Sequence, residues 1–248
     1  MILRDFHVHT RFSDGKNTPE EMVLAALEKG MTAIGFSDHS YTFFDENYCV
    51  PRDRIVEYRD TVRRLKEKYK DRIDVFCGIE QDLFSRESTA EYDYVIGSVH
   101  YLQVGERYIP VDESPETLRW AVETYFSGDP YALAEEYYAQ VAEVAEKTGA
   151  DLIGHFDLPM KFNQKTRLLD ENHPRYRAAW QAAADRLLNS KAAFEWNTGA
   201  MSRGYRSVPY PSPEIQAYLR SHGGILIPSS DSHRADTLCY GFELFALQ

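Results

Sequence analysis

Asp5-Phe6-His7-Val8-His9-Thr10-Arg11-Phe12-Ser13-Asp14-Gly15 follows a short apolar run, Met1-Ile2-Leu3, and has the pattern of a strand that ends in a turn. In an extended strand, residues two apart point to the same face. His7 and His9 would therefore leave one side of the strand, close enough to hold one metal ion, with the Asp14 carboxylate just beyond. Two solvated histidines at a strand end would have the same spacing, so the rest of the chain has to decide between these interpretations.

Short apolar runs alternate with helical segments along the rest of the chain. Further strands are predicted at 32–37, 73–80, 92–100, 151–155, 192–197 and 225–228. Helices are predicted at 18–29, 54–69, from 114, from 129 to 147, at 175–189 and at 214–221. The helix predicted at 18–29 has the expected end signals, with Thr18 as N-cap, Pro19 in its first turn and Gly30 directly after its last turn. Residues 103–111 have the pattern of a hairpin insertion.

Seven strands that alternate with helices predict an α/β fold with a parallel sheet and right-handed crossovers. The chain has 248 residues, and a closed β/α barrel typically takes ~250. An open, doubly wound sheet is the competing architecture. The sequence contains no internal repeat, low-complexity tract or linker, so we expect a single domain over residues 1–248.

Histidines and acidic residues recur at or just after the carboxyl ends of these strands. The set comprises His7, His9, His39, Glu80, His100, His155, Asp231 and His233. In a β/α barrel these strand ends converge on one face, where active sites lie. His173 and His222 fall outside the pattern and are expected to be structural. The pattern therefore predicts a metal site at the barrel mouth, rather than a polar mouth without metal.

The types of ligand narrow the choice of metal. Imidazole and carboxylate groups without thiolates suit Zn, Mn or Fe in a hydrolytic site. The set is too large for one ion, and two ions need a shared ligand, for which a lone Glu80 at a strand end is the natural candidate. Cys49, Cys77 and Cys239 have no metal-like spacing and are expected to be free thiols.

Composition limits the class of partner. The net charge is −11, which opposes nucleic acid as a partner because such binding rests largely on neutralising phosphates with Lys and Arg. No stretch approaches the ~20 apolar residues that span a bilayer, and the first residues lack the pattern of a signal peptide. We therefore expect a cytoplasmic protein with no membrane or nucleic-acid partner, and the sequence does not specify an oligomeric state.

The whole pattern resembles the PHP (polymerase and histidinol phosphatase) family. The matching segments are His7-Val8-His9-Thr10 with Ser13-Asp14-Gly15, Ser37-Asp38-His39, Gly78-Ile79-Glu80, Gly97-Ser98-Val99-His100, Gly154-His155 and Ser230-Asp231-Ser232-His233. The resemblance implies a distorted, seven-stranded, TIM-like (β/α)7 barrel and a centre of two to three divalent metal ions. It implies that the first ion is held by His7, His9, Glu80 and Asp231, the second by Glu80, His100 and His155, and the third by Asp14, His39 and His233.

Such a centre predicts phosphomonoester hydrolysis. Water bound to zinc can have its pKa lowered from 15.7 to about 7, and the chain has no nucleophile motif such as G-x-S-x-G. The hypothesis is direct attack of a metal-bound hydroxide on phosphorus. Asp231 is the candidate to orient that water or accept its proton, and Glu80 is the second catalytic residue because it bridges the ions.

A phosphate dianion usually also contacts Arg or Lys. Arg203 and Arg206, in the loop after the sixth strand, and Lys161, after the fifth, are the candidate substrate-binding residues. Each could instead be a solvated surface charge. Histidinol phosphatases of the family tend to carry Arg in these two loops, so Met160-Lys161 is a departure that bears on the substrate.

The resemblance implies that the most suitable substrate is L-histidinol phosphate, in histidine biosynthesis. The alternative is a PHP-type protein-tyrosine phosphatase, which would need an open, protein-sized cleft, or another small-molecule phosphoesterase. A nuclease is opposed by the negative charge. A non-catalytic metal-binding domain is opposed by the complete set of ligands, since a degenerate domain would be expected to have lost some of them.

Overall fold

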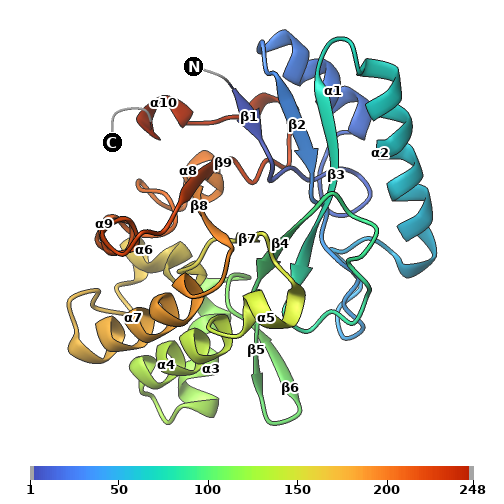
Figure 1. Ribbon diagram of the computed structural model, residues 1–248. Coiled ribbons are helices and arrows are strands. Elements are labelled where there is room, and N and C mark those ends of the chain that lie inside the picture. Colours follow the sequence, from blue (N-terminus) through green and yellow to red (C-terminus); the bar gives the residue numbers. More distant parts are fainter. Residues whose placement is uncertain (1–2, 246–248) are drawn as a thin grey trace.

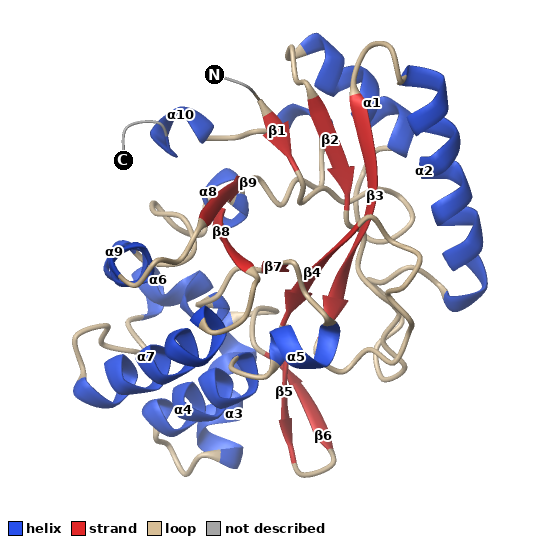
Figure 2. Cartoon of the chain, in the orientation of Figure 1, coloured by secondary structure: helices blue, strands red, loops and turns tan. Residues whose placement is uncertain are grey.

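The computed structural model describes residues 3–245, so Met1 and Ile2 of the opening apolar run lie outside it. Seven parallel strands form one sheet that curls into a nearly closed barrel, with helices on the outside (Figures 1 and 2). In sheet order they are β1 (Arg4–Asp5), β2 (Ala33–Phe36), β3 (Asp74–Asp82), β4 (Tyr94–Ser98), β7 (Leu152–Ile153), β8 (Ala193–Asn197) and β9 (Leu226–Ser229). This confirms the predicted distorted barrel over the open sheet.

The barrel closes through the opening histidine segment. Val8 and Ser232 form an isolated parallel bridge. The His9 amide donates to the Ser232 carbonyl at 2.8 Å, and the Ser232 amide donates to the His7 carbonyl at 3.0 Å. The first strand itself is only two residues long, shorter than predicted. The segment that carries His7 and His9 therefore joins the first and last strands at their carboxyl ends.

The helices are α1 (Pro19–Glu28), α2 (Ile55–Tyr69), α3 (Pro115–Tyr125), α4 (Pro130–Val141), α5 (Val144–Thr148), α6 (Asn163–Thr166), α7 (Pro174–Leu188), α8 (Gly199–Ser202), α9 (Pro213–Ser221) and α10 (Phe242–Phe245). Short 3-10 turns lie at Arg52–Arg54, Leu158–Phe162 and Ala235–Thr237, and β5 (Tyr101–Val104) pairs with β6 (Arg107–Pro110) as the predicted hairpin. The helix predicted from 129 to 147 is interrupted between α4 and α5. The break allows α5 to pack Val144 and Thr148 against Gly97 of β4, where a side chain would collide with them.

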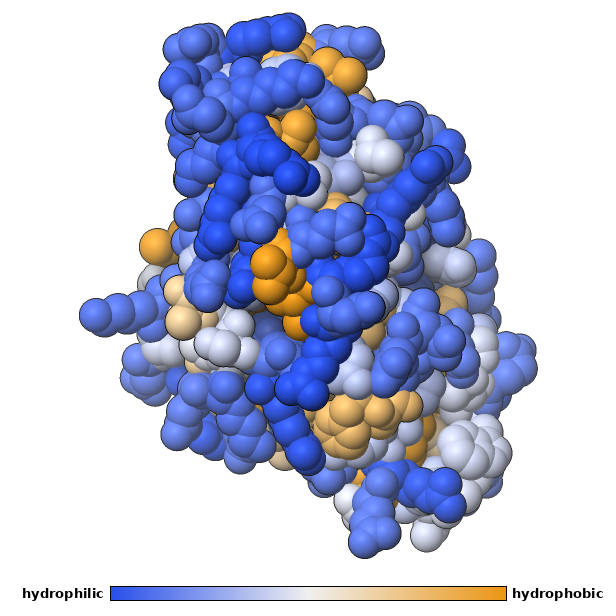
Figure 3. Space-filling model, turned by 90° about the vertical axis from the view of Figure 1, so that its right-hand side faces the viewer, coloured by the Kyte–Doolittle hydropathy of each residue, from blue (hydrophilic) through white to orange (hydrophobic). Residues whose placement is uncertain are grey.

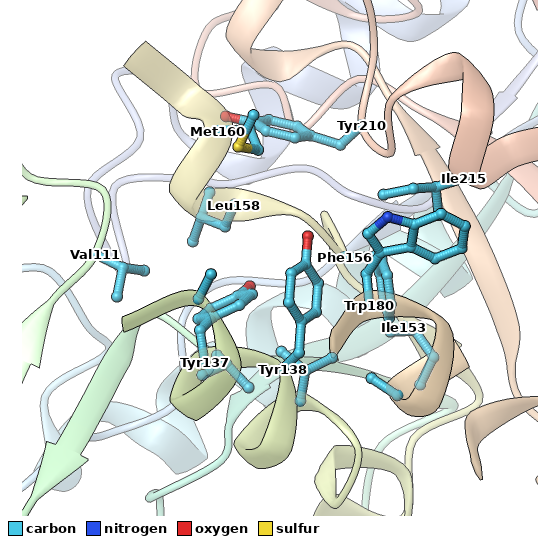
Figure 4. Packing of buried hydrophobic residues seen from close by; sticks show 14 of the residues in the cluster. Val111, Tyr137, Tyr138, Ile153, Phe156, Leu158, Met160, Trp180, Tyr210 and Ile215 are labelled. Atoms are coloured by element: carbon cyan, nitrogen blue, oxygen red, sulfur yellow. The ribbon is translucent and has the colours of Figure 1, made fainter. Parts of the chain in front are cut away.

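Two groups of buried apolar side chains hold the helices on the barrel. One lies between β1–β3 and the pair α1 and α2, and the other between the remaining strands and α3, α4, α7 and α9. In the second group, Tyr138 packs against Phe156 with ring centroids 5.3 Å apart, and Trp180 lies beside Ile215 (Figure 4). The face that carries α2 is largely hydrophilic (Figure 3). Among residues 3–245, no helix is long and apolar enough to cross a membrane.

The interior below the strand ends is filled by Tyr94 of β4. Gly78 and Glu80 are two apart on β3 and so point to the same, inner face. The Tyr94 ring lies where side chains at Gly78 and Gly35 would stand, and its hydroxyl donates to the Phe6 carbonyl at 2.6 Å. The two glycines therefore let one aromatic ring fill the space beneath the metal-ligand candidates.

Gly78→Ala is expected to lower the free energy of unfolding by about 1–3 kcal/mol, the usual cost of overpacking a filled core, because the new methyl group would overlap the Tyr94 ring. Urea denaturation measures the loss. In a Tyr94→Ala background the same substitution should cost clearly less, because the ring is absent. Equal costs in the two backgrounds would contradict this packing argument.

Candidate metal centre

Glu80 lies at the middle of the barrel mouth, and its side chain is buried. Its two oxygens face different histidines. Oε2 lies 2.8 Å from His39 Nδ1, 3.3 Å from His7 Nε2 and 3.6 Å from His9 Nε2, whereas Oε1 lies 3.0 Å from His155 Nε2 and 3.2 Å from His100 Nε2. A carboxylate that divides two sets of imidazoles in this way has the arrangement of a ligand shared between two ions.

A second group surrounds Asp14. His233 Nε2 lies 3.1 Å from Asp14 Oδ2, and His39 Nε2 lies 3.7 Å from Oδ1. These three residues and His9 each offer one ligand atom, and the four atoms lie within 4.8 Å of one another. The turn predicted after the first strand thus brings its carboxylate to histidines that follow the second and last strands.

Asp231 faces the cluster with one oxygen and Arg203 with the other. Its Oδ1 lies 3.3 Å from His9 Nε2, and its Oδ2 accepts a hydrogen bond from Arg203 Nη2 at 2.9 Å. Gly199 makes this approach possible, because a Cβ there would lie 2.8 Å from both Asp231 Cβ and Arg203 Nη2. Burial would raise the pKa of Asp231, but Arg203 and His7 outweigh it and hold that pKa well below its usual value. Asp231 is therefore ionised at neutral pH.

The protonation states of Glu80 and His9 suit metal binding. Burial would raise the pKa of Glu80, but His7 and His39 outweigh it and hold that pKa well below its usual value. Burial, reinforced by His233 and His39, lowers the pKa of His9 to about 3. A carboxylate and a neutral imidazole are the forms that bind metal ions.

Unpaired buried atoms provide a separate test of whether these residues fit metal ions. Within residues 3–245, several side-chain atoms of the cluster are buried without a hydrogen-bond partner: His7 Nε2, both ring nitrogens of His9, His39 Nδ1, Glu80 Oε2 and His155 Nδ1. Buried polar atoms are normally paired, because leaving them unpaired is costly. Nitrogen and carboxylate donors also match the preferences of zinc and similar divalent ions. The residues present therefore fit divalent cations.

A pocket of about 790 Å³ opens over the cluster and is lined by His39, His100, His155, His233, Asp231 and two of the three predicted substrate contacts, Arg203 and Lys161. Arg203 also donates from Nη1 to the Asp231 carbonyl at 3.1 Å. The Lys161 ammonium is paired with Asp112, 2.9 Å from its Oδ2. Arg203 and Lys161 are thus placed beside the metal-ligand candidates.

Arg206 differs from its predicted place. Its side chain is buried, with two guanidinium nitrogens each 3.3 Å from Asp157 Oδ2, and it lies 4.3 Å from the centroid of the Tyr210 ring. It is not among the residues that line the pocket over the cluster. Because its charge is already paired away from the pocket, we no longer expect Arg206 to contact a phosphate.

Two acidic residues behind the cluster were not identified from the sequence. Asp82 Oδ2 lies 3.2 Å from His100 Nδ1, and Glu195 Oε1 lies 2.6 Å from His7 Nδ1. The available signal was an acidic residue within a buried strand, as in Phe194-Glu195-Trp196 of β8. That signal indicates a buried carboxylate but does not predict which side chain it contacts.

Comparisons with known proteins agree with this arrangement. A family model described as the PHP domain matches residues 5–199. A protein of Deinococcus radiodurans named "Probable histidinol-phosphatase" is 29% identical over 251 residues, which cover 97% of this chain and 90% of that protein.

Two crystal structures share the fold. One, from Listeria monocytogenes and also named for a histidinol phosphatase, has a TM-score of 0.83 at 19% identity and covers 98% of this chain and 99% of that one. The other is a histidinol phosphate phosphatase of Lactococcus lactis complexed with zinc, L-histidinol and phosphate. It has a TM-score of 0.71 at 21% identity and covers 94% of this chain and 87% of that one.

Proposed function

This chain belongs to the PHP domain family, and on that premise we propose that it is a metal-dependent phosphomonoesterase that hydrolyses L-histidinol phosphate to L-histidinol and inorganic phosphate. The observation that carries the proposal is the buried Glu80, surrounded by five histidines beneath an open pocket. The relative that matches nearly the whole chain is named for this activity. The reaction would belong to histidine biosynthesis.

The proposed centre contains two to three divalent ions, which would be Zn, Mn or Fe. The proposed ligand sets are His7, His9, Glu80 and Asp231 for the first, Glu80, His100 and His155 for the second, and Asp14, His39 and His233 for the third. The division of Glu80 between two groups of histidines supports its place in both of the first two sets. The short distance between Asp14 and His233 supports the third set.

When bound, the ions would neutralise phosphoryl oxygens and acidify a water molecule, whose pKa can fall to about 7 on zinc. Asp231, ionised and directed by Oδ1 toward the cluster, is proposed to orient the attacking water and accept its proton. Arg203 is proposed to fix the orientation of Asp231 through Oδ2 and to contact the phosphate from the pocket wall. Lys161 is the second proposed phosphate contact. Its attraction for a phosphate would be weakened by its ion pair with Asp112.

The substrate is tested by comparing kcat/KM of Mn-loaded protein on L-histidinol phosphate and on a phosphotyrosine peptide. We expect a preference for L-histidinol phosphate of at least about 10²-fold, because a site built to pair a substrate's polar groups rejects compounds that lack them. A preference for the peptide would contradict the proposed substrate and favour the protein-tyrosine phosphatase alternative. Low activity on both, with metals bound, would indicate a different phosphoester.

We also propose that residues 1–248 form one domain, which is supported by the seven-stranded sheet whose outer members are β1 and β9. The proposed partner is a small phosphorylated substrate. The absence of nucleic-acid and membrane partners, and a cytoplasmic location, stay predictions from the sequence.

A further inference from the structure

We propose that Glu195 is a positioning residue that fixes the ring orientation and tautomer of His7, so that His7 presents Nε2 to a metal ion. The inference rests on the metal centre proposed above and is independent of which phosphoester is hydrolysed. Glu195 lies in the middle of β8 and is buried between the apolar neighbours Phe194 and Trp196. A buried carboxylate in such a strand is costly unless its oxygens are fully paired.

Four donors from different parts of the barrel pair with the Glu195 carboxylate. Oε1 lies 2.6 Å from His7 Nδ1 and accepts a hydrogen bond from the Ser229 hydroxyl at 2.8 Å. Oε2 accepts from the His155 amide and from Asn197 Nδ2, both at 2.9 Å. An ionised carboxylate only accepts hydrogen bonds. The His7 nitrogen that faces Glu195 must therefore carry a hydrogen.

This contact determines which nitrogen of His7 is available to a metal. With the hydrogen on Nδ1, neutral imidazole has its lone pair on Nε2. Nε2 has no hydrogen-bond partner within residues 3–245, and it lies 3.3 Å from Glu80 Oε2 and 3.8 Å from Asp231 Oδ1. Metal-binding histidines characteristically donate their other ring N–H to a carboxylate or carbonyl, which fixes the tautomer and ring orientation. Glu195 gives His7 this arrangement.

Both terminal atoms of the residue 195 side chain face hydrogen-bond donors, so both have to be acceptors. In Glu195→Gln, an amide nitrogen at the Oε1 position would face His7 Nδ1 and favour the tautomer with its hydrogen on Nε2, toward the metal. An amide nitrogen at the Oε2 position would face the backbone N–H of His155, which cannot become an acceptor. Asn197 cannot easily adapt either, because its Oδ1 already accepts from the Gly199 amide at 2.9 Å. Both orientations of the glutamine are therefore unfavourable.

A purely structural role is the competing explanation, because Glu195 also connects β8 to β9 through Ser229 and to the loop after β7 through the His155 amide. The two roles differ in what they change. A structural role alone predicts lower stability with unchanged metal affinity, whereas positioning predicts that metal affinity falls through His7. The measurement therefore has to report metal affinity and the state of the His7 ring separately from stability.

The test prepares the metal-free protein and measures zinc affinity by competition with a chelator, for the wild type and Glu195→Gln. We expect the variant to bind zinc about 10–100-fold more weakly, the usual cost of losing such a partner. In a His7→Ala background, Glu195→Gln should cause no further loss. Tyr138→Phe is the control, because it removes a buried hydroxyl bonded to Tyr176 at 2.9 Å, outside the cluster, and should reduce stability with unchanged zinc affinity.

Nitrogen-15 NMR of the imidazole rings in zinc-loaded wild-type protein provides a second readout that does not depend on the variant folding. We expect the His7 ring to carry its hydrogen on Nδ1. A His7 ring with its hydrogen on Nε2, or a folded Glu195→Gln that binds zinc as tightly as the wild type, would overturn the role of Glu195 and leave the metal centre standing. Wild-type protein that binds no zinc would overturn both proposals.

Discussion

Glu80→Gln is expected to lose bound metal and phosphatase activity together, with kcat/KM reduced by at least about 10³-fold. Removal of a single group that stabilises transition-state charge costs about 10²–10³-fold, and Glu80 is proposed to serve two ions at once. The side-chain amide nitrogen of Gln cannot bind a cation. It would replace either Oε2, which faces His7 and His39, or Oε1, which faces His100 and His155. One of the two ions would therefore lose its shared ligand in either orientation.

The measurement pairs elemental analysis of the purified protein with kcat/KM on L-histidinol phosphate. Glu20→Gln is the control, because Glu20 is a surface carboxylate paired with Lys68 and should be replaceable without loss of metal or activity. Full activity in Glu80→Gln would contradict the bridging assignment. Lost activity with full metal content would leave the ions in place and reassign Glu80 to the chemical step.

Asp231→Asn is expected to lower kcat by about 10²–10⁴-fold, the range that general acid–base groups contribute. The substitution keeps the shape of the side chain but removes the charge and the ability to accept the proton of the attacking water. It also leaves the Arg203 guanidinium at the pocket wall without its carboxylate partner, which is now 2.9 Å away. We expect KM to change less than kcat, because the proposed role of Asp231 is in the chemical step.

The experiment determines kcat and KM separately at saturating metal, with bound metal quantified in the same preparation. Asp60→Asn, on the outer surface of α2, is the matched control and should behave as the wild type. A kcat within about threefold of the wild type, with metal sites full, would contradict the proton-accepting role and leave Asp231 as a ligand only.

The nine predicted metal ligands come together in the structure because their positions follow a rule that the sequence expresses locally. Six of the seven apolar runs have a histidine or acidic residue at or just after their ends, and parallel strands of a barrel bring their carboxyl ends to one face. The seven strands, the hairpin and most helix boundaries follow from equally local signals, such as the capping pair Thr18 and Glu21 of α1. These features depend on neighbours within a few residues.

The role of each charged residue around the cluster depends instead on contacts between distant segments. Arg203 and Arg206 are three residues apart in one loop, yet one faces the pocket and the other pairs with Asp157, 49 residues away. Glu195 contacts His7 across 188 residues. No local pattern encodes these pairings, because they arise from how the closed barrel brings its strands together.

The sequence by itself determined the order of the elements, the α/β class with its parallel sheet and the identity of most metal-ligand candidates, because periodicity and strand-end positions are short-range properties of the chain. Only the tertiary structure decided that Val8 and Ser232 close the barrel, that Tyr94 fills the space at Gly35 and Gly78, and that Arg206 is buried. The physical reason is that a buried charge needs hydrogen-bond or ion-pair partners and a buried ring needs a space of its own shape. Both are supplied by residues that become neighbours only when the chain has folded.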